Sequence, residues 1–234
     1  MLPKIAVILA GGLGTRLRSI VSNVPKSLAP IHDEPFLFLL LRALARLGVS
    51  KIILLTGYLH EQIVAVCGDG SIFGLELIYS YESEPLGTAG ALKNAEKYLT
   101  DVSDFLLLNG DSFCPEAITA LSTAHDLTKR LGVIAVTQVE NSSRFGTVSF
   151  DPRTLTVLSF EEKGSCKTGY VNTGVYRLSN KILREIPANR QCSLEQEIFP
   201  KILSALSVSI VDASFDDIGI PESYHSFLKK TKVN

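Results

Sequence analysis

The chain has 234 residues, 46% of them apolar, and a formal net charge of −1, so it is long enough for one compact domain with a sizeable core. The near-neutral charge argues against the basic surface that nucleic acid or an anionic membrane would need. The longest apolar run, residues 36–41, is far too short to cross a bilayer. We expect a cytoplasmic protein with no nucleic-acid or membrane partner, and with four reduced cysteines whose spacing matches no zinc site: Cys67, Cys114, Cys166 and Cys192.

Apolar, β-rich runs alternate with helical patterns through the first 139 residues. The runs predict strands at 5–9, 52–56, 76–81, 105–109 and 132–139. The patterns between them predict helices at 35–47, 60–67, 88–99 and 115–125. Strands separated by helices of this length are typical of βαβ units, so we predict an α/β fold with a doubly wound, mostly parallel sheet.

The rhythm changes after residue 140. Three segments at short spacing predict strands of a small antiparallel excursion, at 145–150, 155–161 and 169–178. A helix is expected near 193–206, capped by Ser193 with Gln196 completing a capping box. A strand at 208–213 and a closing helix from Pro221 follow. Because no linker, repeat or low-complexity segment interrupts the sequence, we expect a single domain over residues 1–234.

The stretch after the first predicted strand, Leu-Ala-Gly-Gly-Leu-Gly-Thr-Arg-Leu at 9–17, is the most informative in the chain. Its three glycines let the backbone turn tightly, and the exposed N–H groups of such a turn form an anion site. Arg16 adds a planar cation suited to phosphate. The lysine of a P-loop is missing, and a dinucleotide-binding fingerprint fits poorly because residue 17 is leucine. We predict a phosphate-binding loop of another kind; a turn without a ligand is disfavoured because Arg16 and Lys26 flank it.

Two acidic turns lie far apart in the sequence. Asp111 follows the strand at 105–109, where ligands of open α/β sheets bind, and Asp217 precedes Pro221. Each alone is equally well explained as a strand-ending turn or as a helix cap. Because two carboxylates plus phosphate oxygens are what Mg²⁺ commonly uses, the pair is a candidate magnesium site.

Two further charged residues are candidates for contact with a nucleotide. Lys26 lies between Pro25 and Pro30, which would hold it near the phosphates, although a lone loop lysine is usually only solvated. Glu82 could accept hydrogen bonds from the adjacent N1–H and N2–H₂ donors of guanine, whereas uracil offers a single ring N–H. Glu82 therefore favours GTP, with a solvated charge run as the alternative.

The second half holds weaker signals. Residues 161–164, Glu-Glu-Lys-Gly, could offer a carboxylate to sugar hydroxyls and an ammonium to a phosphate, or could be a solvated hairpin end. Gly146 and the stretch at 172–174 lie where a ligand could approach the backbone. Glu195 is interpreted as a favourable first-turn charge of a helix rather than as a ligand.

Together these motifs resemble the sugar-1-phosphate nucleotidyltransferases over most of the chain, from Leu9 to about Tyr224. The likeness is carried by the stretch at 9–17 with its downstream Pro25-Lys26, and by the stretches at 84–88, 109–111, 172–174 and 217–221. The resemblance implies a Rossmann-like α/β domain whose nucleotide-binding half is about 1–112 and whose sugar-phosphate-binding half is about 113–234. Ile220 stands where many relatives have threonine, which weakens a match to the thymidylyl branch.

The resemblance also implies roles for single residues. The catalytic residues would be Arg16, Lys26 and Asp111, and the ligands of Mg²⁺ would be Asp111 and Asp217. The residues that bind the nucleotide would be Leu9, Ala10, Gly11, Gly12, Gly14, Thr15, Arg16, Lys26, Glu82, Gly87, Thr88 and Asp111. The residues that bind the sugar phosphate would be Asn109, Gly146, Glu162, Lys163, Asn172 and Thr173.

The implied reaction is transfer of a nucleotidyl group from a nucleoside triphosphate, with GTP favoured, to a sugar 1-phosphate, with loss of pyrophosphate. Overall likeness implies a heptose 1-phosphate, with mannose 1-phosphate or a UTP- or dTTP-dependent reaction as alternatives. The attacking phosphate is already an anion, so no general base is needed, and positioning and charge neutralisation carry the catalysis. A non-catalytic nucleotide-sugar-binding regulatory subunit is the alternative from another class. A homo-oligomer stays open.

Overall fold

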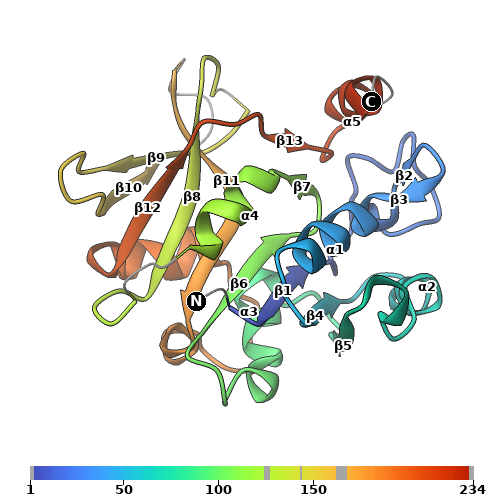
Figure 1. Ribbon diagram of the computed structural model, residues 1–234, viewed down its shortest axis with the longest axis horizontal. Coiled ribbons are helices and arrows are strands. Elements are labelled where there is room, and N and C mark those ends of the chain that lie inside the picture. Colours follow the sequence, from blue (N-terminus) through green and yellow to red (C-terminus); the bar gives the residue numbers. More distant parts are fainter. Residues whose placement is uncertain (1–2, 124–126, 143, 162–167, 232–234) are drawn as a thin grey trace.

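The computed structural model describes residues 3–123, 127–142, 144–161 and 168–231. The centre of the sheet is parallel, and it consists of β1 (Ile5–Leu9), β4 (Lys51–Thr56), β5 (Glu76–Tyr81) and β6 (Asp104–Asn109). These strands are connected through α1 (Phe36–Arg46), α2 (His60–Cys67) and α3 (Gly87–Asn94). Figure 1 shows β1, β4 and β6 in the middle of the molecule, with α2 toward one end. The predicted mixed, mostly parallel α/β fold is confirmed.

A second group of strands joins the sheet beyond β6. It consists of β8 (Gly132–Val139), β9 (Thr147–Phe150), β10 (Val157–Glu161), β11 (Gly169–Ser179) and β12 (Leu206–Val211). β11 pairs antiparallel with β6, β8 and β9, whereas β12 pairs parallel with β8. The expected antiparallel excursion is present. It also includes β8, because the long strand β11 pairs with β6 and also with β8 and β9.

Alternate residues of the central strands face opposite sides of the sheet, and each side has its own core. One core contains Ala6, Ile8 and Leu106, packed with residues of α1, α4 (Pro115–Ser122) and α5 (Pro221–Thr231). The other contains Val7, Phe105 and Leu107, packed with residues of α3 and of the segment at 182–202. Strands that are buried on both faces read as continuous apolar runs, which is why these were predicted well.

The predicted helix at 193–206 is wrong. The chain there forms one π-helical turn (Leu194–Ile198) followed by two 3₁₀ turns (Phe199–Lys201 and Leu203–Ala205). Pro200 has no N–H to donate and its ring crowds the preceding turn, so a continuous α-helix is disfavoured. The capping box differs as well: Ser193 Oγ accepts from the Gln196 N–H at 3.2 Å, but Glu197 Oε1 accepts from the Ser193 N–H at 3.1 Å.

Smaller differences concern the ends of elements. The helix expected at 88–99 stops at Asn94 and continues as a 3₁₀ turn, Glu96–Tyr98. The strand expected at 208–213 begins two residues earlier, at Leu206. Two short ladders had no signal in the sequence: β2 (Pro30–Ile31) pairs with β3 (Glu34–Pro35), and β7 (Ser112–Phe113) pairs with β13 (Asp216–Asp217).

Candidate active site

A cleft of about 400 Å³ opens at the carboxyl ends of β1, β4 and β6. This is the edge at which open α/β sheets bind ligands. The cleft draws its walls from several segments, and its lining includes Leu9, Ala10, Gly11, Gly12, Leu13, Lys26, Ser27, Leu55, Glu82, Pro85, Gly87, Thr88, Ala91, Asn109, Gly110, Asp111 and Gln191. Ten of the predicted site residues therefore line one cleft: Leu9, Ala10, Gly11, Gly12, Lys26, Glu82, Gly87, Thr88, Asn109 and Asp111.

The loop after β1 folds back onto Lys26. Gly14 has a φ of +60°, which favours glycine, and a Cβ there would lie 3.0 Å from Lys26 Cβ. Thr15 and Arg16, in contrast, are exposed and do not belong to the lining of the cleft. The structure thus places the glycines of the loop at the cleft and leaves the Arg16 side chain at its outside.

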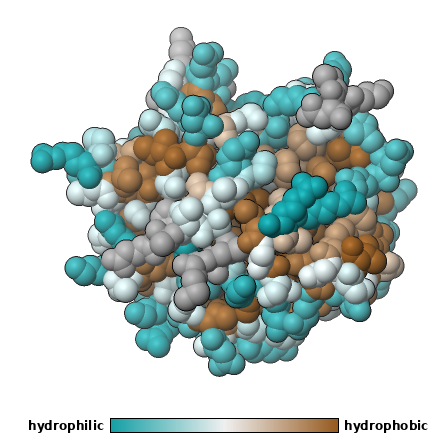
Figure 2. Space-filling model, viewed as in Figure 1, coloured by the Kyte–Doolittle hydropathy of each residue, from teal (hydrophilic) through white to brown (hydrophobic). Residues whose placement is uncertain are grey.

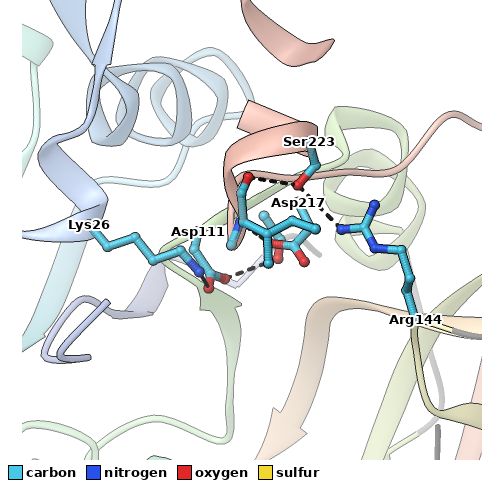
Figure 3. A network of polar contacts seen from close by, with 8 residues as sticks. Lys26, Asp111, Arg144, Asp217 and Ser223 are labelled. Carbon is cyan, nitrogen blue, oxygen red and sulfur yellow. Dashed lines mark hydrogen bonds and ion pairs between the residues drawn. The ribbon is translucent and has the colours of Figure 1, made fainter. Parts of the chain in front are cut away.

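Asp111 and Asp217 lie side by side. β13 pairs with β7 so that Asp217 is opposite Ser112, and the Ile218 N–H donates to the Asp111 carbonyl at 3.0 Å. Lys26 Nζ forms an ion pair with Asp111 Oδ2, and Ser112 Oγ donates to Asp111 Oδ1 at 3.1 Å. Figure 3 shows the Lys26, Asp111 and Asp217 side chains converging from three segments. The burial of Asp217, together with the charge of Asp111, raises the pKa of the Asp217 carboxyl.

A second cation approaches this pair from the opposite side. Figure 3 shows the Arg144 guanidinium directed toward Asp217 and Ser223, with Lys26 on the far side of the carboxylates. Arg144 Nη2 donates to Ser223 Oγ at 3.4 Å, and the Arg144 charge partly offsets the raised pKa of Asp217. The sequence interpretation gave Arg144 no role, because nothing local connects it with a turn more than 70 residues away.

Glu82 is held at the other end of the cleft. Its Oε2 accepts a hydrogen bond from the Leu86 N–H at 3.3 Å, and a Cβ on Gly11 would lie 3.1 Å from its Oε1. Gly57 is similarly close to the Glu82 side chain. Burial raises the pKa of Glu82, and the Leu86 N–H partly offsets that shift. The carboxylate is therefore packed between two glycine-containing loops rather than solvated in a charge run.

Of the residues predicted to bind the sugar phosphate, only some lie at the cleft. Asn109 lines the cleft, and Gly174, at a φ of +76°, packs against the Asn109 side chain. Thr173 is fully buried, and its hydroxyl donates to the Ala135 carbonyl at 3.0 Å, so its side chain faces the core. Gly146 lies in the turn before β9, outside the lining of the cleft. Glu162 and Lys163 lie outside the described residues.

Asn172 belongs to a network that the sequence interpretation missed. Its Nδ2 donates to the Tyr176 hydroxyl at 2.7 Å, which in turn donates to Glu195 Oε1 at 3.1 Å. Thr88, on the wall of the cleft, donates to Glu195 Oε2 at 2.9 Å. Because these residues come from three separate segments, no local pattern could have connected them.

Outside the cleft, the described residues offer a second hollow and buried cysteines, but no cluster of metal ligands. A more open hollow of about 550 Å³ lies between β2 and α5, lined by Pro30, His32, His225, Leu228 and Lys229, and contains none of the predicted site residues. Among the described residues, no cluster of three or more His, Cys, Asp or Glu side chains could hold a metal ion. Cys67, Cys114 and Cys192 are buried free thiols, and Cys166 lies outside the described residues.

Both polar and apolar side chains are present at the molecular surface (Figure 2). On the face seen in Figure 2, hydrophilic side chains stand around the rim and apolar ones lie between them. In the part of the chain that the structure describes, the helices are all too short or too polar to cross a membrane.

The chain is similar to known proteins over nearly its whole length. The family model for nucleotidyl transferase matches residues 5–233. The chain is 38% identical over 226 residues to D-glycero-α-D-manno-heptose 1-phosphate guanylyltransferase of Campylobacter jejuni, covering 95% of this chain and 98% of that protein. A protein of the same name from Aneurinibacillus thermoaerophilus is 37% identical, covering 96% and 97%. HddC from Yersinia pseudotuberculosis, whose crystal structure is known alone and complexed with GMP-PN, superposes with a TM-score of 0.86 at 35% identity, over 99% of this chain and 100% of that one. The chain belongs to the nucleotidyl transferase family.

Proposed function

We propose that this protein transfers the guanylyl group of GTP to D-glycero-α-D-manno-heptose 1-phosphate and releases pyrophosphate. The observation that carries the proposal is the cleft at the carboxyl ends of β1 and β6, where Lys26, Asp111 and Glu82 face one space. The names of the two bacterial relatives, which match over nearly their whole length, support both the guanylyl group and the heptose. The two halves expected from the sequence, 1–112 and 113–234, would hold the nucleotide and the sugar phosphate.

Glu82 is the proposed reader of the base. Its carboxylate is packed at one end of the cleft, where a flat ring could lie along residues 9–12. Two acceptor oxygens match the adjacent N1–H and N2–H₂ donors of guanine, whereas a pyrimidine offers no such pair. A desolvated carboxylate left without donors is costly, so this arrangement disfavours bases that cannot satisfy it.

The phosphates would lie between Lys26 and the glycines of the loop after β1. The exposed backbone of residues 11–14 suits an anion, and Lys26 supplies a point charge at the other side. The attacking oxygen of the sugar phosphate is already ionised, so the protein has no proton to remove. Its work is to bring two anions together in line and to screen their repulsion, a task in which Arg16, Lys26 and the more distant Arg144 would share.

Asp111 and Asp217 are the proposed holders of a magnesium ion. Two carboxylates on adjacent backbone segments fit the hard oxygen donors that Mg²⁺ prefers, with phosphate oxygens and water completing the shell. A bound divalent ion would supply neutralisation of charge on the transferring phosphoryl group. The ladder between β7 and β13 keeps the two carboxylates adjacent. Ser112 Oγ and the Ile218 N–H hold the Asp111 turn in place through their hydrogen bonds to Asp111.

The sugar phosphate would occupy the side of the cleft toward β11. Asn109, in the cleft lining, and Asn172, in β11, would offer their amide groups, and Gly146, Glu162 and Lys163 are kept as proposed contacts. Thr173 would contribute through its backbone, because its hydroxyl is already bonded in the core.

A substrate matrix tests the proposal. The purified protein is assayed for pyrophosphate release with GTP, UTP, CTP, dTTP and ATP against heptose, mannose and glucose 1-phosphates, in the presence of Mg²⁺. We expect the highest kcat/KM for GTP with the heptose ester. A preference for UTP or dTTP would overturn the guanylyl assignment, and a preference for mannose 1-phosphate would overturn the heptose assignment. Binding of a nucleotide sugar with no pyrophosphate release under any combination would indicate the non-catalytic subunit instead.

A further inference from the structure

Glu195 is a half-buried carboxylate that lies behind the cleft: it is bonded to Thr88, a residue of the lining, but does not itself belong to the lining. Three hydroxyls donate to it: Tyr176 to Oε1 at 3.1 Å, and Thr88 and Ser193 to Oε2 at 2.9 and 3.2 Å. Among the described residues it forms no ion pair. Hydrogen bonds to an ionised carboxylate are stronger than neutral ones, so Glu195 fixes the orientation of all three hydroxyls.

An ionised carboxylate can only accept hydrogen bonds, and this fixes the direction of every bond that reaches it. Thr88 must donate to Glu195, and it accepts from the Leu194 N–H at 2.8 Å. Its one proton is therefore committed, and toward the cleft the Thr88 oxygen has only an acceptor lone pair to offer. The wall at the start of α3 is thereby prepared for an N–H or O–H group of a ligand.

A second chain of bonds runs from Glu195 into β11. Tyr176 is fully buried and donates to Glu195, so its oxygen must accept from Asn172 Nδ2 at 2.7 Å. The other end of the amide, Asn172 Oδ1, accepts from the Gly174 N–H at 2.9 Å. The amide orientation is thus determined, and the second proton on Nδ2 is the group that Asn172 can still donate.

We infer that Glu195 is a positioning residue that sets the hydrogen-bond polarity of Thr88 in the cleft lining and of Asn172 in β11, making Thr88 an acceptor for the nucleotide and Asn172 a donor to the sugar phosphate. The inference rests on the proposed function for the identity of the two ligands. Glu195 touches neither of them; it acts through Thr88 on one side and through Tyr176 on the other. Sequence position alone gives Glu195 no such role, because Thr88 and Tyr176 reach it only in the folded chain.

The test uses three single variants with separate readouts. Thr88→Val removes the nucleotide-side hydroxyl, and Tyr176→Phe breaks only the link from Glu195 to Asn172. Glu195→Gln keeps the shape but replaces one acceptor oxygen by a donor, so at least one of the hydroxyl bonds must reverse. We expect Thr88→Val to raise the KM for GTP, Tyr176→Phe to raise the KM for the sugar phosphate, and Glu195→Gln to raise both, each by roughly tenfold, the loss of about one hydrogen bond.

A double variant separates positioning from a general loss of structure. If Glu195 acts on the nucleotide through Thr88, then Thr88→Val with Glu195→Gln should raise the KM for GTP no more than the larger single effect. Multiplied effects in the double variant would overturn the inference. So would a Glu195→Gln protein whose two KM values stay within about twofold of the parent.

Two controls complete the design. Glu185→Gln, at an exposed glutamate in the preceding 3₁₀ segment, should leave both KM values and the melting temperature unchanged. Should Glu195→Gln fail to fold, Tyr176→Phe still decides, because an unchanged KM for the sugar phosphate in that variant contradicts the relay. Inactivity of the unmodified protein with GTP would instead refute the proposed function, so the two failures are distinguishable.

Discussion

Ile218 donates its backbone N–H to the carbonyl oxygen of Asp111 at 3.0 Å, and this bond extends the short ladder between β7 and β13. The ladder brings the turn before α5 against the turn after β6, so that two carboxylates from opposite halves of the sequence become neighbours. Side chains alternate along a strand, so the Asp216 side chain faces away from that of Asp217. Asp216 Oδ1 pairs with Lys230 at 2.6 Å on α5.

This alternation gives a matched pair of variants for the proposed metal site. We expect Asp217→Asn and Asp111→Asn each to lower kcat/KM by roughly 10²-fold or more, the scale of losing one electrostatic stabiliser. Asp216→Asn, one residue away on the opposite face, should stay within about threefold of the parent, because an exposed ion pair contributes little. The measurement is pyrophosphate release at saturating Mg²⁺. Near-normal turnover of folded Asp111→Asn would refute the assignment.

Lys26 is expected to matter for the phosphates rather than for the fold. The side chain is only 13% exposed and pairs with Asp111, yet Lys26→Met keeps the aliphatic stem that packs against Gly14. We expect kcat/KM to fall by roughly 10²-fold or more, because one cation facing the transferring phosphate is lost. Lys51→Met, at a lysine whose partner Glu76 is mostly exposed, is the matched control and should be nearly silent. A Lys26→Met enzyme as active as the Lys51→Met one would contradict the role.

Asp217 also predicts a pH dependence of stability. Burial and the charge of Asp111 raise the pKa of this carboxyl in the folded chain above its ordinary value of 3.8. Between the ordinary and the raised pKa the folded state binds more protons than the unfolded state, so this group lowers stability as pH rises through that window. Asp217→Asn should therefore melt at a higher temperature than the parent near pH 7, and the difference should shrink as the pH is lowered toward 4. A variant that is less stable than the parent at pH 7 would show that the carboxylate is held favourably.

The buried thiols give a prediction that is independent of the function. Burial raises the pKa of both Cys67 and Cys114 to about 11, so at pH 8 only roughly one thiol in a thousand is the reactive thiolate. We expect both to resist iodoacetamide in the folded protein and to be alkylated once the protein is denatured. Peptide mass spectrometry after brief labelling provides the measurement. Fast labelling of either cysteine without denaturant would mean that its core opens readily.

The sequence interpretation succeeded where a local pattern determines the structure. The strands at 5–9 and 105–109 are apolar because both of their faces are buried, and Gly14 of the loop at 9–17 has a local φ of +60° that favours glycine. It failed where tertiary contacts decide. Glu195 looks like an ordinary helix-start charge until β11 brings Tyr176 to it, and the helix expected around it is broken at Pro200. Arg144 became notable only when α5 placed Ser223 beside it.

The choice of base provides the last prediction, and it depends on Glu82. The carboxylate is packed against Gly11 and Gly57 and keeps one oxygen on the Leu86 N–H, so Glu82→Gln fits the same space while turning one acceptor into a donor. Guanine would then face an N–H where it needs an oxygen, and we expect the ratio of kcat/KM for GTP over UTP to fall by roughly 10- to 100-fold. Glu84→Gln, at an exposed glutamate two residues on, controls for the loss of charge in this loop and should leave the ratio unchanged. Because a general loss of activity would lower both values together, only the ratio measured with the two triphosphates reports on the base. An unchanged ratio in Glu82→Gln would contradict this role of Glu82 and would leave the backbone of residues 9–12, which line the same cleft, as the part that discriminates between bases.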